Sequence, residues 1–178
     1  MQRVLVVGCS GAGKSTFSRR LAAVTGLPRT ELDYAFWHPG WVQTPREEWW
    51  AKVTALCAAP AWILDGNYTS SLHIRIPKAD TVIWLDYPRW LCLARVIGRV
   101  ARNYRRVRGG LPEGCPEKVD LEFLRYIWKF NANHGRRMAA AIEETGQHLR
   151  VYRLKSDSEA DRLLAELRRS GERSAPAI

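Results

Sequence analysis

The chain has 178 residues, of which 46% are hydrophobic and 26% are charged. This balance is typical of a folded globular protein with one main core and excludes the disordered and fibrous classes. No apolar run approaches the roughly 18 residues that a membrane span requires, so we expect a cytoplasmic protein without a membrane partner. The net charge of +10, carried by 22 arginines and 6 lysines, indicates an anionic partner, although solubility alone is the alternative reason.

The N-terminal segment predicts a strand, a glycine loop and a helix in succession. Residues 3–7 form a short apolar run rich in β-branched side chains, which is typical of a buried parallel strand. Residues 8–15, Gly-Cys-Ser-Gly-Ala-Gly-Lys-Ser, fit the phosphate-loop pattern G-x-x-x-x-G-K-S in full. Apolar residues at helical spacing follow up to about residue 24. The pattern therefore lies in the context that separates a phosphate loop from a chance glycine turn.

The chemistry of this loop is that of triphosphate binding. Its glycines let backbone N–H groups turn toward phosphates, and the following helix directs its positive dipole end at them. Lys14 supplies a charge for the transferred phosphate, and the hydroxyl of Ser15 can bind Mg²⁺. We therefore expect ATP and Mg²⁺ as cofactors. The residues expected to bind the nucleotide are Gly8, Ser10, Gly11, Ala12, Gly13, Lys14, Ser15 and Thr16.

Strands and helices alternate along the rest of the chain. Strands are predicted at 61–64, 81–85 and 149–152, with a weaker one at 30–32, and helices near 45–58, 88–106, 120–144 and 157–170. This alternation predicts an α/β protein with a five-stranded parallel sheet and helices on both faces. Glycines and prolines over 107–118 predict a mobile loop between two helices.

We expect a single domain over residues 1–170. Its acceptor-binding region would lie at about 30–60 and its lid at about 100–135, and residues 171–178 would form a flexible tail.

Two carboxylates follow predicted strands. Asp65 ends the run at 61–64, where burial without a partner would cost several kcal/mol. Because ligands bind at the carboxyl ends of parallel strands, we expect Asp65 to face the magnesium ion through water. Asp86 ends the next strand in the same way, and it is equally well explained as a cap for the helix that begins near Pro88.

An aromatic stretch over 34–41 follows Asp33. Aromatic faces can stack on a small molecule while a carboxylate orients the attacking hydroxyl group, so this region is interpreted as the acceptor site. The alternative is a hydrophobic cluster under a loop. His38 is interpreted as a surface or hydrogen-bonded loop histidine, and a catalytic role is the alternative.

Arginines line the predicted helix that leads into the mobile loop. Those at 95, 99, 102 and 106 fall on one stripe, which could close over the triphosphate and stabilise charge on the transferred group. Arg136 and Arg137 could complete this clamp from the returning helix. A nucleic-acid surface and a solvated face are the alternatives.

These landmarks together resemble the adenylate-kinase-like P-loop kinases and, within them, the group named DNA topology modulation proteins. The resemblance to adenylate-kinase-like kinases rests on Asp65-Gly66, on the Arg-x-x-Gly-Arg run at 95–99 and on Leu154-Lys155-Ser156. The resemblance to the DNA topology modulation group rests on Leu32-Asp33 with Trp37, Pro39 and Trp41, and on the runs at 65–68 and 113–118. It implies a three-layer P-loop NTPase fold with a helical lid insertion. It also implies that Lys155 and Ser156 lie beside the adenine ring.

The chain departs from adenylate kinases after Asp65-Gly66. The Phe-Pro-Arg that those enzymes carry is replaced by Asn67-Tyr68-Thr69, so the arginine that would hold a nucleoside monophosphate is missing. Asp33 among aromatic residues is instead similar to small-metabolite kinases such as shikimate and gluconate kinases.

The sequence therefore predicts a phosphotransferase that moves the γ-phosphoryl group of Mg-ATP to a nucleotide, nucleoside or hydroxylated metabolite. The residues expected to act in catalysis are Lys14, Asp33, Arg95, Arg99, Arg136 and Arg137. The alternative is a nucleotide-gated DNA-binding protein with ATPase activity that affects DNA topology. A monomer and a homodimer both remain open.

Overall fold

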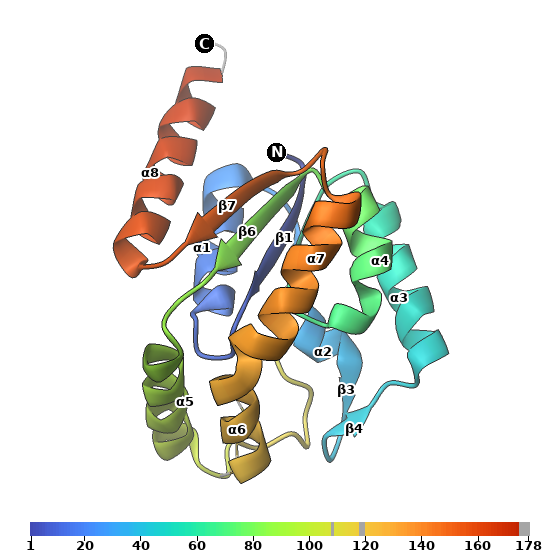
Figure 1. Cartoon of the computed structure of the whole chain (residues 1–178), viewed down its shortest axis with the longest axis vertical. Helices are drawn as coiled ribbons and strands as arrows, with labels where there is room; N and C mark the ends of the chain where they lie inside the picture. The colour runs from blue at the N-terminus through green and yellow to red at the C-terminus, as the bar shows by residue number, and fades with distance from the viewer. Residues whose placement is uncertain (108, 118–119, 175–178) are drawn as a thin grey trace.

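A parallel sheet forms the centre of the computed structural model, which describes residues 1–107, 109–117 and 120–174 (Figure 1). The five strands are β1 (Arg3–Gly8), β2 (Arg29–Glu31), β5 (Trp62–Asp65), β6 (Thr81–Leu85) and β7 (Arg150–Leu154). They are all parallel and lie in the order β2-β5-β1-β6-β7. The predicted five-stranded parallel sheet is confirmed.

Helices cover both faces of this sheet. Helices α1 (Lys14–Thr25) and α8 (Asp157–Ser174) lie on one face, and α3 (Arg46–Ala58), α4 (Leu72–Arg75) and α7 (Arg136–Thr145) lie on the other (Figure 1). Side chains of β1 alternate between the two layers: Val4 and Val6 join the α1 side, whereas Leu5 and Val7 join the α3 side. Burial on both faces explains the continuous apolar run, and the three-layer fold is confirmed.

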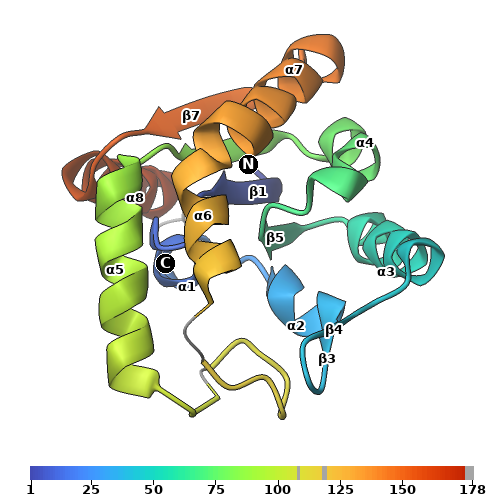
Figure 2. The same ribbon diagram turned by 60° about the horizontal axis from the view of Figure 1, so that its bottom comes forward.

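A helical insertion extends beyond the carboxyl edge of the strands. It consists of α5 (Arg89–Asn103), a connecting segment and α6 (Leu121–Phe130), which continues through the π-helical turn η3 (Asn131–Gly135) into α7 (Figure 2). Residues 108 and 118 of the predicted loop lie outside the described residues.

The arginine stripe on α5 is shorter than predicted, because α5 ends at Asn103 and not near residue 106. The chain leaves the helix to pair with the returning arm of the loop, where Arg105 N donates to Glu117 O and Glu117 N donates to Arg106 O, both at 2.9 Å. Arg106 therefore lies outside the helix that carries Arg95, Arg99 and Arg102.

A second insertion follows β2. The short helix α2 (Leu32–Phe36) leads into an antiparallel hairpin of β3 (Trp37–His38) and β4 (Val42–Gln43), which the sequence did not predict. Two 3-10 turns, η1 (Thr69–Ser71) and η2 (Ile76–Lys78), flank α4.

Helix α8 continues to Ser174, so helical structure reaches into the segment for which a flexible tail was predicted, and residues 175–178 lie outside the described residues. Among the helices of the described residues, none combines the length and the apolar character that a membrane span requires.

Candidate active site

The phosphate loop lies between β1 and α1, in a backbone conformation that depends on glycine. Gly8, Gly11 and Gly13 have φ of 146°, 87° and 86°. A Cβ atom at Gly11 would lie 2.2 Å from the backbone oxygen of Cys92, and one at Gly8 would lie 2.4 Å from that of Leu85. The loop therefore packs backbone to backbone against β6 and α5, which leaves no room for a side chain.

The start of α1 offers the groups that bind phosphate. The helix begins at Lys14, and no side chain caps its N-terminus at Gly13. Lys14 Nζ lies over the loop and donates to the Cys9 carbonyl at 3.1 Å. N–H groups of a helical first turn and an ammonium group beside them form an anion-binding arrangement, so the predicted nucleotide residues, from Gly8 to Thr16, are brought together here.

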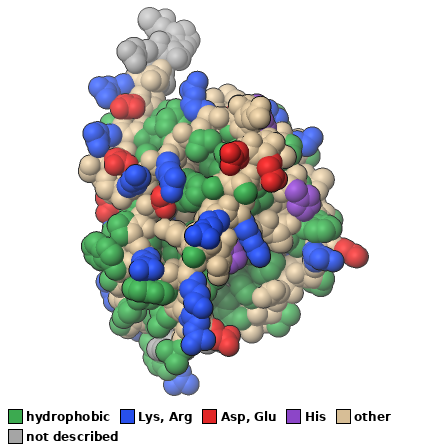
Figure 3. All heavy atoms as spheres, viewed as in Figure 1, with side chains coloured by type: hydrophobic (Ala, Val, Ile, Leu, Met, Phe, Trp, Pro, Cys, Tyr) green, Lys and Arg blue, Asp and Glu red, His purple; other side chains and the backbone are tan. Residues whose placement is uncertain are grey.

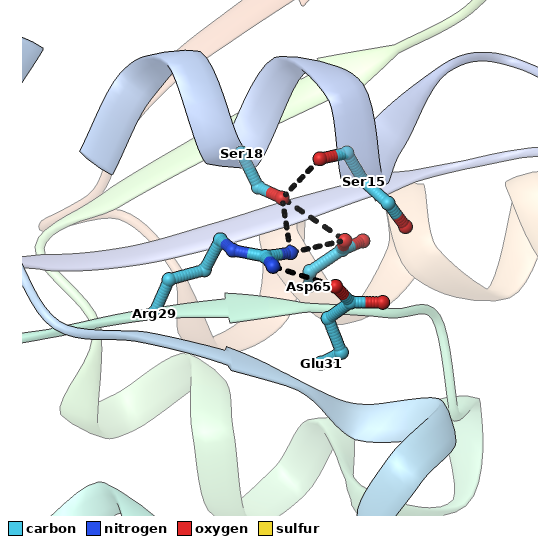
Figure 4. Close-up of polar contacts among 5 residues, drawn as sticks. All are labelled: Ser15, Ser18, Arg29, Glu31 and Asp65. Carbon is cyan, nitrogen blue, oxygen red and sulfur yellow. Dashed lines mark hydrogen bonds and ion pairs between the residues drawn. The ribbon is translucent and has the colours of Figure 1, made fainter. Parts of the chain in front are cut away.

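Asp65 lies beside Ser15 at the end of β5, as Figure 4 shows. Its side chain accepts a hydrogen bond from Ser18 Oγ at 3.0 Å and lies 3.7 Å from Arg29 Nη1. Arg29 also pairs with Glu31 at 2.6 Å. Burial raises the pKa of Asp65, an effect that Lys14, Ser15 and Ser18 only partly oppose.

Ser15 and Asp65 fit a magnesium ion that is held mainly by water and phosphate oxygens. Among the described residues there is no group of three His, Cys, Asp or Glu side chains that could hold a metal ion by itself. Since Mg²⁺ keeps several waters and binds phosphate oxygens readily, one hydroxyl and one carboxylate are a sufficient protein contribution.

Asp33, in the short helix α2, lies near this carboxylate. The Tyr68 hydroxyl donates to Asp33 Oδ1 at 2.7 Å. The negative charge of Asp33 contributes to the raised pKa of Asp65, so the two carboxylates are close enough to interact.

The aromatic stretch contains rings that pack on the core and rings that remain partly exposed. Phe36 packs on Trp49 and Tyr68, with ring centroids 5.1 Å and 4.5 Å away, and so belongs to the hydrophobic layer around α3. Trp37 and Trp41 contact each other at 5.4 Å and remain partly exposed. Phe36 thus fits the hydrophobic-cluster interpretation, whereas the acceptor-site interpretation of Trp37 and Trp41 stays a prediction.

Asn67 and Tyr68 connect the two halves of the site, a role that the sequence did not reveal. Asn67 Nδ2 donates to Gly8 O at 2.6 Å, and Gly8 N donates to Asn67 Oδ1 at 2.8 Å. Arg75, which is fully buried, donates to the carbonyl groups of Gly66, Asn67 and Tyr68. One charged residue in the otherwise apolar segment 74–76 was the signal available in the sequence.

The predicted catalytic arginines occupy different surroundings. Arg95 pairs with Asp157 at 2.5 Å and lies 4.0 Å from the Cβ position of Gly13, so it is beside the phosphate loop. Arg99 pairs with Glu117 of the lid at 2.8 Å. Arg136 and Arg137 are exposed at the start of α7, and within the described part of the chain neither contacts the phosphate loop.

The lid loop lies against the hairpin of the second insertion. Gly40 N donates to Gly114 O at 2.9 Å, and Trp41 Nε1 donates to Pro116 O at 3.1 Å. Cys115, which is buried, donates through Sγ to the His38 carbonyl at 3.2 Å. The loop therefore covers the hairpin, which lies in the region predicted to bind the acceptor. The His38 ring lies within hydrogen-bond distance of a threonine hydroxyl, Thr44 Oγ1, at 3.2 Å.

Lys155 and Ser156 precede α8, at a reciprocal cap. Ser156 Oγ accepts from Glu159 N at 3.3 Å, and the Glu159 carboxylate accepts from Lys155 N at 2.8 Å. The Arg95–Asp157 pair brings this turn next to the phosphate loop. Asp86 pairs with Arg153 at 2.7 Å, which gives it a structural partner.

The sequence matches no protein-family model, and no curated protein matches it. Solved structures are similar to it. A shikimate kinase from Acinetobacter baumannii in complex with shikimate is 17% identical in sequence to this chain and has a TM-score of 0.58. The match covers 99% of this chain and 96% of the shikimate kinase. A shikimate kinase from Bacteroides thetaiotaomicron is 16% identical and has a TM-score of 0.57, and the match covers 96% of this chain and 98% of that enzyme. The chain thus has the P-loop kinase fold of the shikimate kinases over nearly its whole length.

Proposed function

We propose that this protein transfers the γ-phosphoryl group of Mg-ATP to a hydroxyl group of a small acceptor. The observation that carries this is the joined geometry of Gly8, Asn67, Tyr68 and Asp33. The Asn67 side chain is bonded to the phosphate loop, and the next residue is bonded to Asp33. A carboxylate in a fixed relation to a phosphate loop is suited to orient an acceptor hydroxyl and to accept its proton.

Each part of the site has a role in this reaction. Bound Mg-ATP supplies the transferable phosphoryl group, and Ser15, together with Asp65 acting through water, would hold the metal ion. The backbone N–H groups of the loop would bind the phosphates. Lys14 and Arg95 would stabilise the negative charge that spreads over the transferred group.

The lid would exclude water from this reaction. Its loop covers the hairpin at Gly40 and Trp41, and Arg99 holds it through Glu117. Since water would compete with the acceptor for the phosphoryl group, a closed lid favours transfer over hydrolysis.

The acceptor that we propose is a small metabolite rather than AMP. The position after Asp65-Gly66 carries Asn67-Tyr68 instead of a phosphate-binding arginine, and one structural neighbour is in complex with shikimate. Lys155 and Ser156 would lie beside the adenine ring, and Arg136 and Arg137 would approach the phosphates only after movement of α7. Within this fold we also propose membership in the DNA topology modulation group, on the runs at 65–68 and 113–118.

The DNA-binding alternative has less support. Arg95 and Arg99 pair with carboxylates, and Arg106 lies outside α5, so the arginine stripe is not a row of cations available to a DNA backbone. Binding to duplex DNA that weakens steeply with salt would favour this alternative.

A screen of acceptors tests the proposal. Nucleosides, nucleotides and hydroxylated metabolites are compared for stimulation of ADP release from Mg-ATP. In the variant Lys14→Ala we expect turnover to fall by about 10³-fold or more, because the charge on the transferred group loses its ammonium partner. Circular dichroism checks that this variant is folded. Unchanged turnover in folded Lys14→Ala would refute the proposal.

A further inference from the structure

The outer side of α5 carries apolar residues that face solvent. Trp90, Ile97 and Tyr104 are 64%, 52% and 56% exposed. Ala94 and Ala101, which lie between them in the chain, are exposed as well. Figure 3 shows hydrophobic side chains gathered at the lower left of the molecule, where α5 lies in Figure 1. We call these five residues the outer stripe of α5.

The spacing of the outer stripe is that of a helix–helix contact. Its residues follow one another at intervals of four, three, four and three positions, which is the spacing of the apolar positions in a coiled coil. Tyr104 is the first residue after the helix and continues the stripe. Large and small side chains alternate along it, so a second helix can approach closely at the two alanines. The pattern therefore predicts that another helix packs here.

Neither the core nor the candidate site uses the outer stripe. The opposite face of α5 carries Cys92 and Val96, which are completely buried. A third side carries Arg95 and Arg99, which form the ion pairs beside the phosphate loop and with the lid. A surface helix needs only one apolar face to pack on its own domain. The second apolar face of α5 is thus available for a contact with another molecule.

The outer stripe contains no charged residue, although the chain has 22 arginines and a net charge of +10. Nucleic acids and anionic membranes are bound through cations, so a stripe without cations does not suit them. Two copies of this chain repel each other through their net charge. The outer stripe is a surface at which two copies can meet without placing like charges opposite each other. Its charge pattern therefore favours a second copy as the partner.

Exposed apolar residues continue from α5 onto the neighbouring helix α6. Trp128 is 45% exposed, and the guanidinium group of Arg89 lies over its ring, 4.1 Å from the centroid. Arg89 directly precedes Trp90, so Trp128 lies near the start of the outer stripe. The apolar surface is thus wider than one helix, as the contact area of a specific interface requires.

We propose that two copies of this chain associate through the outer stripe of α5 in a two-fold symmetric pair. Such a pair uses the same surface of both copies, so Ile97, at the middle of the stripe, would meet Ile97 of the second copy at the symmetry axis. Trp90 and Tyr104 would be buried at the two ends of the contact. The phosphate loop would stay accessible, because Arg95 lies on another side of α5. The pairing does not depend on the proposed function.

Sedimentation velocity of the full-length chain tests the pairing. From about 1 to 300 μM, the range of small interfaces, wild type should shift from the mass of a monomer to that of a dimer. In Ile97→Glu the dissociation constant of the dimer should rise about 100-fold or more, because two carboxylates would meet at the axis. Val42→Glu makes the same charge change at a position that is 58% exposed on the β3–β4 hairpin, and it should leave the constant unchanged. Circular dichroism checks that both variants are folded.

A mixing experiment shows whether residue 97 meets its own copy. Ile97→Lys alone should be as weakly associated as Ile97→Glu. An equimolar mixture of the two should form a heterodimer, since opposite charges then face each other at the axis. Three results would each overturn the proposal: wild type that stays monomeric at every concentration, Ile97→Glu that pairs like wild type, and a mixture that associates no more than either variant alone.

Two further measurements distinguish a membrane from a second copy and separate this inference from the proposed function. Vesicles of phosphatidylcholine, with and without phosphatidylserine, are sedimented with wild type and with Ile97→Glu. We expect wild type to stay in the supernatant; vesicle binding that Ile97→Glu loses would assign the outer stripe to a lipid surface and overturn the pairing. Lys14→Ala should dimerise like wild type, so the loss of turnover and the loss of pairing are independent results.

Discussion

The phosphate side and the acceptor side of the site are built in different ways. On the phosphate side, eight consecutive residues from Gly8 to Ser15 fold into one loop whose shape depends on its glycines. On the acceptor side, Asp33, Tyr68, Trp41 and Tyr126 come from four separate segments that meet only in the folded chain. The first is determined by backbone conformation and the second by side-chain packing.

This difference predicts different responses to substitution. A backbone-determined site should fail when a single Cβ atom is added, whereas a packed site should lose function in steps as individual contacts are removed. The four experiments below test that contrast, in order of decreasing expected effect.

The largest effect is expected on kcat, when a substitution on the acceptor side separates catalysis from nucleotide binding. In Asp33→Asn, kcat should fall by about 10²- to 10⁴-fold, since the amide cannot accept the proton of the acceptor hydroxyl. The affinity for Mg-ATP should be unchanged, because Asp33 belongs to the acceptor side. Steady-state kinetics and calorimetry measure the two quantities.

Tyr68→Phe is the matched control for Asp33→Asn. It removes only the hydroxyl group that donates to Asp33 Oδ1, so kcat should fall less than in Asp33→Asn, because the carboxylate that accepts the proton is still present. If both variants lowered kcat equally, Asp33 would be a structural partner of Tyr68 and not the acceptor base.

Gly11→Ala tests the phosphate side by itself. The new Cβ atom would lie 2.2 Å from Cys92 O at a φ of 87°, so the loop must move. We expect Mg-ATP affinity to fall about 100-fold, equivalent to about 2.8 kcal/mol. Gly26→Ala is the control, because Gly26 has a φ of 71° and nothing within 4 Å of its Cβ position. It should lower stability by about 1 kcal/mol and leave affinity intact. Equal affinity losses in both would show that backbone strain, and not the contact with α5, is responsible.

Glu117→Gln tests how the lid is held on the acceptor side. The carboxylate is 6% exposed and pairs with Arg99, so its loss should weaken lid closure by about 1–2 kcal/mol. Limited proteolysis between α5 and α6 should become about tenfold faster. Glu113→Gln, at an exposed position in the same loop, should not change the rate. Identical rates in all three proteins would mean that this ion pair does not hold the lid.

Asp65→Asn should have the smallest effect on stability, and the one that depends most on pH. Because the folded-state pKa of Asp65 is raised, the ionised carboxylate destabilises the fold, and wild-type stability is lost as pH rises through that pKa. The variant should therefore gain stability relative to wild type between acidic and neutral pH, while it loses magnesium-dependent turnover. Urea denaturation across this range measures the difference. A stability difference that does not vary with pH would contradict the raised pKa.

The sequence predicted the sheet and the phosphate loop because both depend on local signals. The strands are continuous apolar runs, and the loop is a contiguous pattern with a fixed spacing. The β3–β4 hairpin was missed, because two-residue strands carry no periodicity. The end of α5 was placed too late, since the pairing of Arg105 and Arg106 with Glu117 overrides the helical pattern of the arginines.

The candidate site could be predicted only in part, because only some of its residues have a local signal in the sequence. Asp33 and Asp65 follow strands and could be identified from that position. Asn67 and Arg75 act through hydrogen bonds to the backbone of distant or folded-back segments, and these have no signature in the order of residues.

Asn67 and Tyr68, which are adjacent in the chain, connect the phosphate loop to Asp33. The Asn67 side chain bonds to the backbone of Gly8 and the Tyr68 side chain bonds to Asp33, so one peptide unit, with Cα atoms about 3.8 Å apart, connects the contacts to both parts of the site. Arg75 donates hydrogen bonds to the carbonyl groups of the same two residues and so holds this peptide unit in one conformation. Insertion of one glycine between Asn67 and Tyr68 would change the distance between the phosphate loop and Asp33, while both regions stay folded.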